Sequence, residues 1–409
     1  MAGEWPVQRL PNLLTLQRGH DLAADKRIDG EFPVIAASGQ VGVHNEAKCD
    51  APGVVIGRSG SIGGAQWIEE PFWPLNTTLY VIDFKGNNPY FCYSVLKSID
   101  FQRFNAGSGV PTLNRNHLAD IEVPAISRAE QDGIANLLYT LEAKIDLNRQ
   151  MATTLEDMAR ALFRSWFVDF DPVRAKAEGR DTGLPAHIAA LFPDGLDEDG
   201  LPKGWVKISY RDACKSIYSG GTPATGRIDF WGGGIPWLSS GETRSHFVVA
   251  TEKSISELGV EGSSTRLAPA MATVVATAGQ GSTRGQASIL GIDTYINQST
   301  AALVANNDLV SEVYLYADLS GRYEELRAIS DSQSSRGSLT TKLLADLMIV
   351  FPTPSVMATF TTMASTTFER IFEIERTAQT LTEMRHSLLP RLLSGELRVD
   401  NAAASIAAA

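Results

Sequence analysis

The strongest constraint on the fold is an internal repeat, in which the second half of the chain returns to residues of the first half after 226 positions. Leu118-Ala119-Asp120-Ile121 comes back as Leu344-Ala345-Asp346-Leu347. Further matches follow at the same spacing without a gap: Ile145 with Ile371, Thr154-Leu155 with Thr380-Leu381, Met158 with Met384, and Leu162 with Leu388. Matches that keep one spacing over this length predict two structural units built on one plan.

Upstream of these matches the two halves differ in spacing. The segment 53–60 (GVVIGRSG) resembles 272–279 (ATVVATAG), and 73–82 (WPLNTTLYVI) resembles 296–304 (INQSTAALV). Insertions and deletions therefore separate the first parts of the halves, while the second parts stay in register. At 409 residues the chain suits two domains of ordinary size, each beginning with a variable part.

The variable parts are predicted to be β-rich. They are dense in Gly, Ser and Thr, and turn residues bound each short apolar run. The runs lie at 54–56, 79–82, 273–276 and 301–304. A curled sheet or partial barrel with long loops is the simplest structure for this pattern.

The better-matched parts are predicted to be long helices, because their apolar residues recur in alternating steps of four and three. Ser127 followed by Glu130 is a capping-box start for the first helix, and Pro172 lies just past its end. Pro354 and Ser355 suit the start of the second helix, and Gly395 suits its stop. The first apolar seam is Ile134, Leu138, Leu141, Ile145, Asn148, Ala152, Leu155, Ala159, Leu162 and Trp166; the second is Phe360, Ala364, Thr367, Ile371, Ile374, Ala378, Leu381, Arg385 and Leu388.

Neither helix can bury its seam alone, so we expect the two helices to pair. The acidic connection over 171–204 is long enough for the chain to turn back. The expected fold is α+β: two β-rich domains, each followed by a long helix, with the two helices in an antiparallel coiled coil. The alternative is that each helix packs on its own domain. The coiled-coil positions are expected to be Ile145, Leu155, Leu162, Ile371, Leu381 and Leu388.

The repeat also predicts domain boundaries. These are a first domain at 1–126, a first helix at 127–170, an acidic linker at 171–204, a second domain at 205–353, a second helix at 354–395 and a flexible tail at 396–409.

Composition and charge argue against several classes of protein. No stretch approaches the roughly 20 apolar residues of a membrane span, and Met1 to Leu16 lacks the pattern of a signal peptide, so a soluble cytosolic protein is expected. Cys49, Cys92 and Cys214 are far apart, which argues against a zinc site or a disulfide framework. The net charge of −11 argues mildly against a nucleic-acid partner, but a local basic face can still bind phosphate.

Enzyme motifs are absent from the sequence. Asn88-Pro89-Tyr90-Phe91 approaches the loop of amino-group methyltransferases but lacks its second proline, and we interpret it as a turn. There is no Gly-Lys dipeptide for a P-loop, and Gly107-Ser108-Gly109 is not a nucleophile elbow. Glu46-Ala47-Lys48 and Glu142-Ala143-Lys144 do not form a cluster of nuclease carboxylates. No catalytic residue and no metal ligand is therefore predicted.

Gly-rich polar loops with basic residues are the candidate binding elements of both variable parts. Arg can bond guanine in a bidentate fashion, Asn and Gln can bond adenine, and Ser and Thr can hold phosphate. This chemistry suits DNA, but loops of lectins and ordinary turns share the composition. The candidates of the first half are Arg58, Ser59, Ser61, Asn76, Thr77, Arg103, Ser108, Asn114 and Arg115; those of the second half are Gln280, Ser282, Thr283, Arg284, Gln298, Ser299, Arg336, Ser338 and Lys342.

The segment 127–173 closely resembles the central helix of type I restriction–modification specificity subunits. Its ending WFVDFDPV, at 166–173, is particularly specific, and the second helix lacks this ending. LPKGW at 201–205 resembles the beginning of that family's second target-recognition domain, and LLPRLLSGEL at 388–397 resembles its C-terminal end. The resemblance covers nearly the whole chain.

The resemblance implies a non-catalytic DNA-recognition subunit. Each variable domain would be a target-recognition domain that reads one half-site in double-stranded DNA, and the paired helices would fix the spacer between half-sites. Two methyltransferase subunits would dock on the helices, and restriction subunits would add translocation and cleavage. S-adenosylmethionine, ATP and Mg would belong to these partners, so this chain would hold no cofactor. The rivals are a two-domain scaffold or lectin-like binder that never touches DNA, and a stand-alone nuclease or methyltransferase.

Overall fold

The computed structural model describes residues 5–105, 109–279, 281–333 and 338–399. Contacts divide the chain into two compact units: the first is Met1–Ile145 with Thr380–Ala409, and the second is Asp146–Gln379. The first unit therefore combines two segments that are distant in sequence. Within the described residues, no helix is both long enough and apolar enough to cross a membrane.

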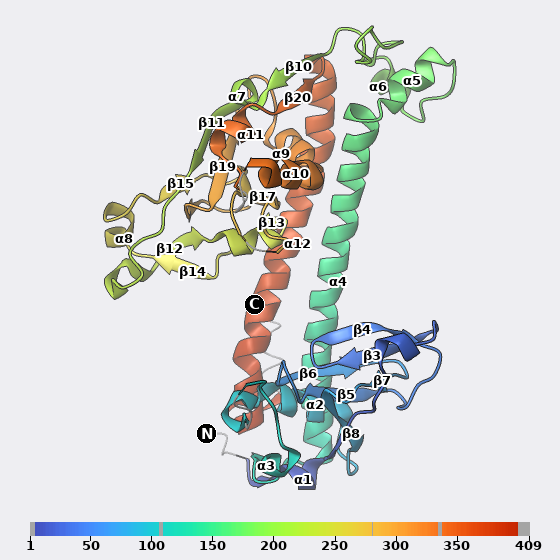
Figure 1. Ribbon diagram of the computed structural model, residues 1–409, viewed down its shortest axis with the longest axis vertical. Coiled ribbons are helices and arrows are strands. Elements are labelled where there is room, and N and C mark those ends of the chain that lie inside the picture. The colour runs from blue at the N-terminus through green and yellow to red at the C-terminus, as the bar shows by residue number, and fades with distance from the viewer. Residues whose placement is uncertain (1–4, 106–108, 280, 334–337, 400–409) are drawn as a thin grey trace. The chain divides into compact units, whose positions relative to one another are not determined.

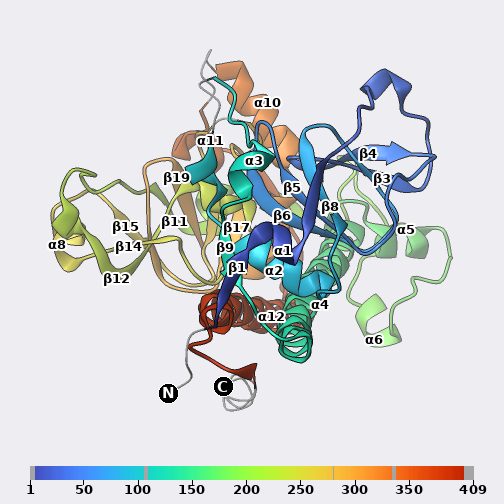
Figure 2. The ribbon, with the colours of Figure 1, turned by 90° about the horizontal axis from the view of Figure 1, so that it is seen from below.

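The first unit contains two small sheets, and the smaller one extends to the side of the larger (Figures 1 and 2). Strand β5 is central and fully buried, because its side chains alternate between two apolar clusters on opposite faces of the sheet. Val54 and Ile56 pack toward helix α2 (Pro89–Ser98), whereas Val55 packs with Ile35 and Phe72. The larger sheet has the order β2 (Thr15–Arg18), β8 (Thr78–Asp83), β5 (Gly53–Gly57), β6 (Gly63–Ile68); the smaller has β4 (Gly39–His44), β3 (Phe32–Ala36), β7 (Trp73–Pro74); β1 (Val7–Arg9) pairs with β9 (Glu122–Pro124).

The second unit has larger versions of the same sheets. Val274 and Val275 of its central strand β16 likewise face two different clusters. The strand orders are β11 (Cys214–Ser219), β19 (Thr300–Ala305), β16 (Thr273–Ala276), β17 (Ala287–Leu290), β13 (Phe247–Val248) and β14 (Lys253–Ile255), β12 (Trp231–Leu238), β18 (Thr294–Ile296), β15 (Arg266–Ala268); β10 (Val206–Ser209) pairs with β20 (Met348–Phe351).

The two units repeat one topology. The order β11-β19-β16-β17 corresponds to β2-β8-β5-β6, and the parallel pair β12–β18 corresponds to β3–β7. The register agrees as well: Gln8 lies opposite Val123 in the first unit, and Ile208 lies opposite Ile349 in the second. The strands β13 and β15 are additions of the second unit. The drifting spacing in the sequence thus reflects insertions around a shared strand order.

Two long helices follow the sheets, as the apolar seams predicted. Helix α4 begins at Arg128, where the Ser127 hydroxyl donates to a Glu130 carboxylate oxygen at 2.9 Å. Helix α12 ends at Ser394, and Gly395 adopts the left-handed conformation that suits a helix stop. The helices are α1 (Leu10–Leu13), α2 (Pro89–Ser98), α3 (Arg115–Leu118), α4 (Arg128–Phe167), α5 (Asp171–Ala177), α6 (Ala186–Ala189), α7 (Tyr210–Ala213), α8 (Glu257–Glu261), α9 (Glu312–Ser320), α10 (Tyr323–Gln333), α11 (Thr341–Ala345) and α12 (Pro354–Ser394).

The first unit contains the beginning of α4 and the end of α12, which run antiparallel. Glu130 pairs with Arg398 at 3.3 Å, and Glu142 pairs with Arg385, so residue numbers rise along one helix as they fall along the other. Their seams share one core, which consists of Ile134, Leu138, Leu141, Ile145, Leu381, Leu388, Leu392 and Leu393 together with residues of the first domain.

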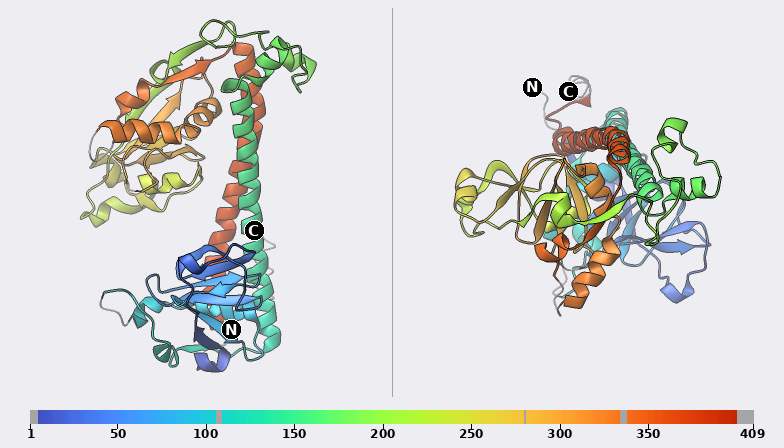
Figure 3. Two further views of the ribbon diagram at one scale, coloured as in Figure 1. Left: turned by 45° about the vertical axis from the view of Figure 1, so that its right-hand side comes forward. Right: turned by 90° about the horizontal axis from the view of Figure 1, so that it is seen from above.

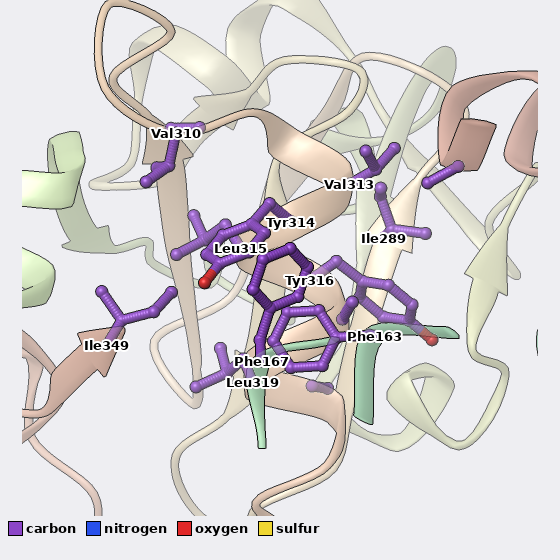
Figure 4. Close-up of a cluster of buried hydrophobic side chains, with 14 of the residues drawn as sticks. Phe163, Phe167, Ile289, Val310, Val313, Tyr314, Leu315, Tyr316, Leu319 and Ile349 are labelled. Carbon is purple, nitrogen blue, oxygen red and sulfur yellow. The ribbon is translucent and has the colours of Figure 1, made fainter. Parts of the chain in front are cut away.

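The second unit contains the other halves of the two helices, and here the domain packs on both. Phe167 of α4 lies 5.1 Å from Phe360 of α12 and 4.8 Å from Tyr314 of α9, measured between ring centroids. Figure 4 shows the α4 side chains Phe163 and Phe167 close to the α9 side chains Tyr314 and Tyr316. The α+β architecture with two helix-bearing domains and an antiparallel helix pair is therefore confirmed, and each helix also packs on a domain.

The segment 171–204, which the sequence presents as an acidic linker, is folded. It carries α5 and α6 beside the end of α4 (Figure 3). Phe192 is buried, and its ring lies 4.9 Å from the Trp166 ring. The acidic side chains are on the outside of this small apolar core, so net charge alone did not indicate that the segment folds.

Candidate nucleic-acid interface

In the first unit, three loop segments meet at one end of the larger sheet. The backbone N–H of Arg58 donates to the Thr77 carbonyl at 2.8 Å, and the N–H of Leu113 donates to the Arg58 carbonyl at 2.8 Å. Ser59 pairs with Thr112 in an isolated bridge. Segments that follow three different strands or helices are thus fixed side by side.

Two further segments complete this surface. The N–H of Ala37, at the β3–β4 turn, donates to the Thr77 hydroxyl at 3.3 Å. The N–H of His20 donates to the Pro74 carbonyl at 2.8 Å, which places Asp21 where its carboxylate accepts from the Asn76 amide. We call these five segments the first-unit edge, defined by Asp21, Ala37, Arg58, Ser59, Asn76, Thr77 and Thr112.

The second unit builds the same edge with different side chains. The N–H of Thr277 donates to the Ser299 carbonyl at 2.8 Å, and the N–H of Leu339 donates to the Thr277 carbonyl at 2.9 Å. The Thr222 hydroxyl donates to the Gln298 side chain. We call this surface the second-unit edge, defined by Thr222, Thr277, Gln298, Ser299 and Ser338.

The two edges share a backbone framework, which is held by equivalent hydrogen bonds, and differ in chemistry. Arg58 of one edge stands where Thr277 stands in the other, and Asn76 stands where Gln298 stands. Polar side chains of several types on a rigid backbone are what direct reading of base edges requires. Sequence inspection missed Asp21, Ala37, Thr222 and Thr277, since their partners are distant along the chain.

Other candidates of the first half lie apart from the hydrogen bonds that join the edge. Arg103 is exposed and pairs with Asp100 at 3.0 Å. Asn114 accepts from the N–H of Asn116 and caps α3. Ser61 is exposed in the β5–β6 turn. Ser108 and the side chain of Arg115 lie outside the described residues.

Among the candidates of the second half, Arg284 is buried, whereas an arginine that contacts DNA from a loop would be exposed. It is only 8% exposed, and its guanidinium pairs with Asp331. The Ser282 carbonyl accepts from the Tyr323 hydroxyl at 3.0 Å, and Thr283 is half-buried beside it. Lys342 is exposed on α11. Gln280 and Arg336 lie outside the described residues.

All six predicted coiled-coil residues lie in, or pack against, the apolar cores that the two long helices share with the domains. Ile145, Leu381 and Leu388 are buried in the first unit, and Ile371 is buried in the second. Leu155 and Leu162 are partly buried against the core of the second unit.

Two carboxylates of α4 anchor polar networks in these cores. Burial acts to raise the pKa of Glu142, but hydrogen bonds and charge from Arg385 and Lys97 outweigh it and hold the pKa below its usual value. Arg385, an interruption of the predicted seam, is thus paired. Burial likewise acts to raise the pKa of Glu156, and His246, Arg160 and Tyr316 together lower it. These networks are structural, and the described residues contain no group of His, Cys, Asp and Glu arranged to hold a metal ion.

The fold has solved counterparts. An S subunit of a type I restriction–modification system from M. genitalium superposes with a TM-score of 0.62 at 15% identity, covering 95% of this chain and 96% of that chain. Residues 3–157 match the family described as type I restriction modification DNA specificity domain.

Curated relatives agree with this class. The chain is 26% identical over 331 residues to the type I restriction enzyme HindI specificity subunit of Haemophilus influenzae, covering 70% of this chain and 71% of the relative. It is 24% identical over 299 residues to the MjaIX specificity subunit of Methanocaldococcus jannaschii, covering 72% and 65%. Over residues 3–157 the chain thus matches the model of this family, and over about 70% of its length it is similar to type I restriction enzyme specificity subunits.

Proposed function

We propose that the chain recognises a bipartite target in double-stranded DNA, with one half-site read by each edge. The observation that carries this proposal is the pair of edges, which hold the same backbone hydrogen bonds but present different polar side chains. A constant framework with variable contact residues suits a protein whose sequence preference varies while its mode of docking does not. The candidate contacts include Arg58, Asn76 and Gln298.

The proposed partners are two methyltransferase subunits that dock on the long helices, and restriction subunits that join them. An exposed apolar stripe on α4 supports a docking face. Leu147, Met151 and Met158 are 55%, 39% and 63% exposed, and their spacing places them on one side of the helix, next to the seam. This chain would be non-catalytic and cytoplasmic, and S-adenosylmethionine, ATP and Mg would be bound by the partners.

The test is DNA binding by the full chain assembled with its methyltransferase subunits. Mapping of methylated adenines in the host genome would first give both half-sites and the spacer. The assembled complex is expected to bind a duplex with both half-sites more tightly than duplexes in which one half-site is scrambled. Equal binding to all duplexes, or to none, would contradict the proposal and favour a scaffold or a lectin-like binder.

A further inference from the structure

A hollow of about 380 Å3 in the second unit collects basic side chains. Arg211 of α7, Lys215 of β11 and Lys342 of α11 line it. Strand β11 is at the edge of its sheet, so the Lys215 side chain is exposed rather than covered by a further strand. The three cations come from three separate elements that the fold brings to one place.

Most of the positive charge in this hollow is uncompensated. Arg211 pairs with Asp346 at 2.7 Å. Lys215 and Lys342 have no ion pair or hydrogen bond through their side chains within the part of the chain that the structure describes. Two unpaired lysines in a chain of net charge −11 form a local site for an anion.

The first unit has an equivalent hollow of about 280 Å3, and its lining is different. Pro11 and Asn116, which line it, are equivalent in the repeat to Arg211 and Lys342. Thr15 also lines it and begins β2, whereas Lys215 lies in a β-bulge near the start of β11. Four leucines also line it, with Lys85 as the one cation of the lining. The hollow therefore belongs to the shared scaffold, whereas the cluster of cations belongs to the second unit. A structural role would not require charges that the equivalent hollow lacks.

Two segments of the second-unit edge continue into the walls of the basic hollow. Leu339 bonds to Thr277 in the edge, and the next residue, Thr340, caps α11, which carries Lys342. Strand β11 carries Lys215 and runs on to Gly220, which bonds to Asn297 beside the edge. We propose that the hollow binds a backbone phosphate of the DNA next to the half-site that this edge reads, with Lys215 and Lys342 as its ligands. This inference rests on the proposed function.

The test compares the salt dependence of DNA binding in the full chain assembled with its partners. Each phosphate contact contributes about 0.9 to the slope of log affinity against log salt. Lys215→Ala with Lys342→Ala is expected to lower the slope by about 1, and to weaken binding on the order of tenfold at 0.1 M salt, equally on cognate and random duplexes. Lys215→Arg with Lys342→Arg should keep the slope. The matched control is Lys207→Ala with Lys253→Ala, two exposed lysines of the same unit outside the hollow.

Several outcomes would overturn the inference. They are an unchanged slope, an equal drop in the control, or a loss confined to the cognate sequence, which would mark base contacts instead. Thermal stabilisation of the wild-type chain by inorganic phosphate, lost in the Ala variant without any change in the DNA slope, would assign the hollow to a free phosphate ligand. Failure of the wild-type complex to bind any duplex would instead refute the proposed function, and the inference with it.

Discussion

Arg58 and Arg284 come from loops of similar composition but have different surroundings. Arg58 is half-buried on the first-unit edge, and its guanidinium donates to the Asn76 carbonyl at 3.4 Å, a long bond that a base could replace. Arg58→Ala is expected to weaken binding at one half-site by about 1–3 kcal/mol and to relax its specificity there. Competition binding with duplexes scrambled in one half-site measures both effects.

The control is Arg9→Ala, since Arg9 is exposed and pairs with Asp120 away from the edge. An equal loss on every duplex would make Arg58 a phosphate contact. Arg284→Ala has a different expected result: the buried guanidinium holds Asp331, so the free energy of unfolding should fall by about 1–2 kcal/mol. A half-site-specific loss for this variant without any loss of stability would contradict the placement of Arg284.

Glu156 is expected to make the stability of the second unit depend on pH. Its carboxylate accepts from Arg160 at 2.6 Å and contacts His246 Nδ1 at 2.8 Å. Because its pKa is lowered from 4.5 in the folded state, its contribution is fully present above that value and is lost as the pH falls through the folded pKa. Glu156→Gln should lower the free energy of unfolding by about 1–3 kcal/mol at neutral pH. Chemical denaturation at a series of pH values measures this difference, which should shrink in acid; a constant difference would contradict the assignment.

At the scale of elements, the sequence predicted features that depend on local pattern. The helix seams, the Ser127 cap and the Gly395 stop all depend on residues within a few turns, so periodicity and capping rules were sufficient. The edges depend on contacts such as Ala37 with Thr77, which no local pattern encodes.

Dependence on distant contacts also explains two other places where the structure differs from the sequence prediction. Segment 171–204 is rich in acidic residues, and its apolar residues form no periodic pattern, yet Phe192 finds a ready partner in Trp166. The α4 seam widens in the second unit to include Phe163 and Phe167, because the domain packs there as well as the partner helix. Side chains of a helix that packs on both a domain and a partner helix do not follow a heptad pattern.

The exposed stripe of α4 is expected to matter for assembly and not for folding. Met158→Asp adds a charge to a side chain that is 63% exposed, so the unfolding temperature should be unchanged. If a methyltransferase subunit covers the stripe, the buried charge should weaken its binding by about 2 kcal/mol or more. Size-exclusion chromatography or calorimetry with the partner tests this.

Ile228→Asp is the control for the stripe, since Ile228 is an 88% exposed apolar residue of the same unit that is not on α4. Loss of assembly in both variants would indicate a general effect of added charge. Unchanged assembly in both would place the docking surface elsewhere.

At the scale of the whole molecule, the two units do not correspond to the two halves of the sequence. Each long helix is divided between the units, so that residues after Thr380 complete the core of the N-terminal domain. Trp5 joins them: its ring N–H donates to the Leu392 carbonyl at 2.8 Å, and Arg398 stacks on its ring. The stability of the first domain therefore depends on the last helix of the chain.

Two substitutions on α12 test this division. Leu392 is buried in the first unit and Phe368 in the second, although one helix carries both. Leu392→Ala should cost about 2–5 kcal/mol and Phe368→Ala about 3–5 kcal/mol, each through the cavity it leaves. Hydrogen exchange should then rise in β5 and α2 for Leu392→Ala, and in β16 and α9 for Phe368→Ala. If each variant raises exchange only in its own unit, then each unit unfolds together with its own part of α12. If the molecule instead unfolds as one cooperative unit, loss of α12 would expose both domains. Either variant would then raise hydrogen exchange equally in both, and that result would contradict the division.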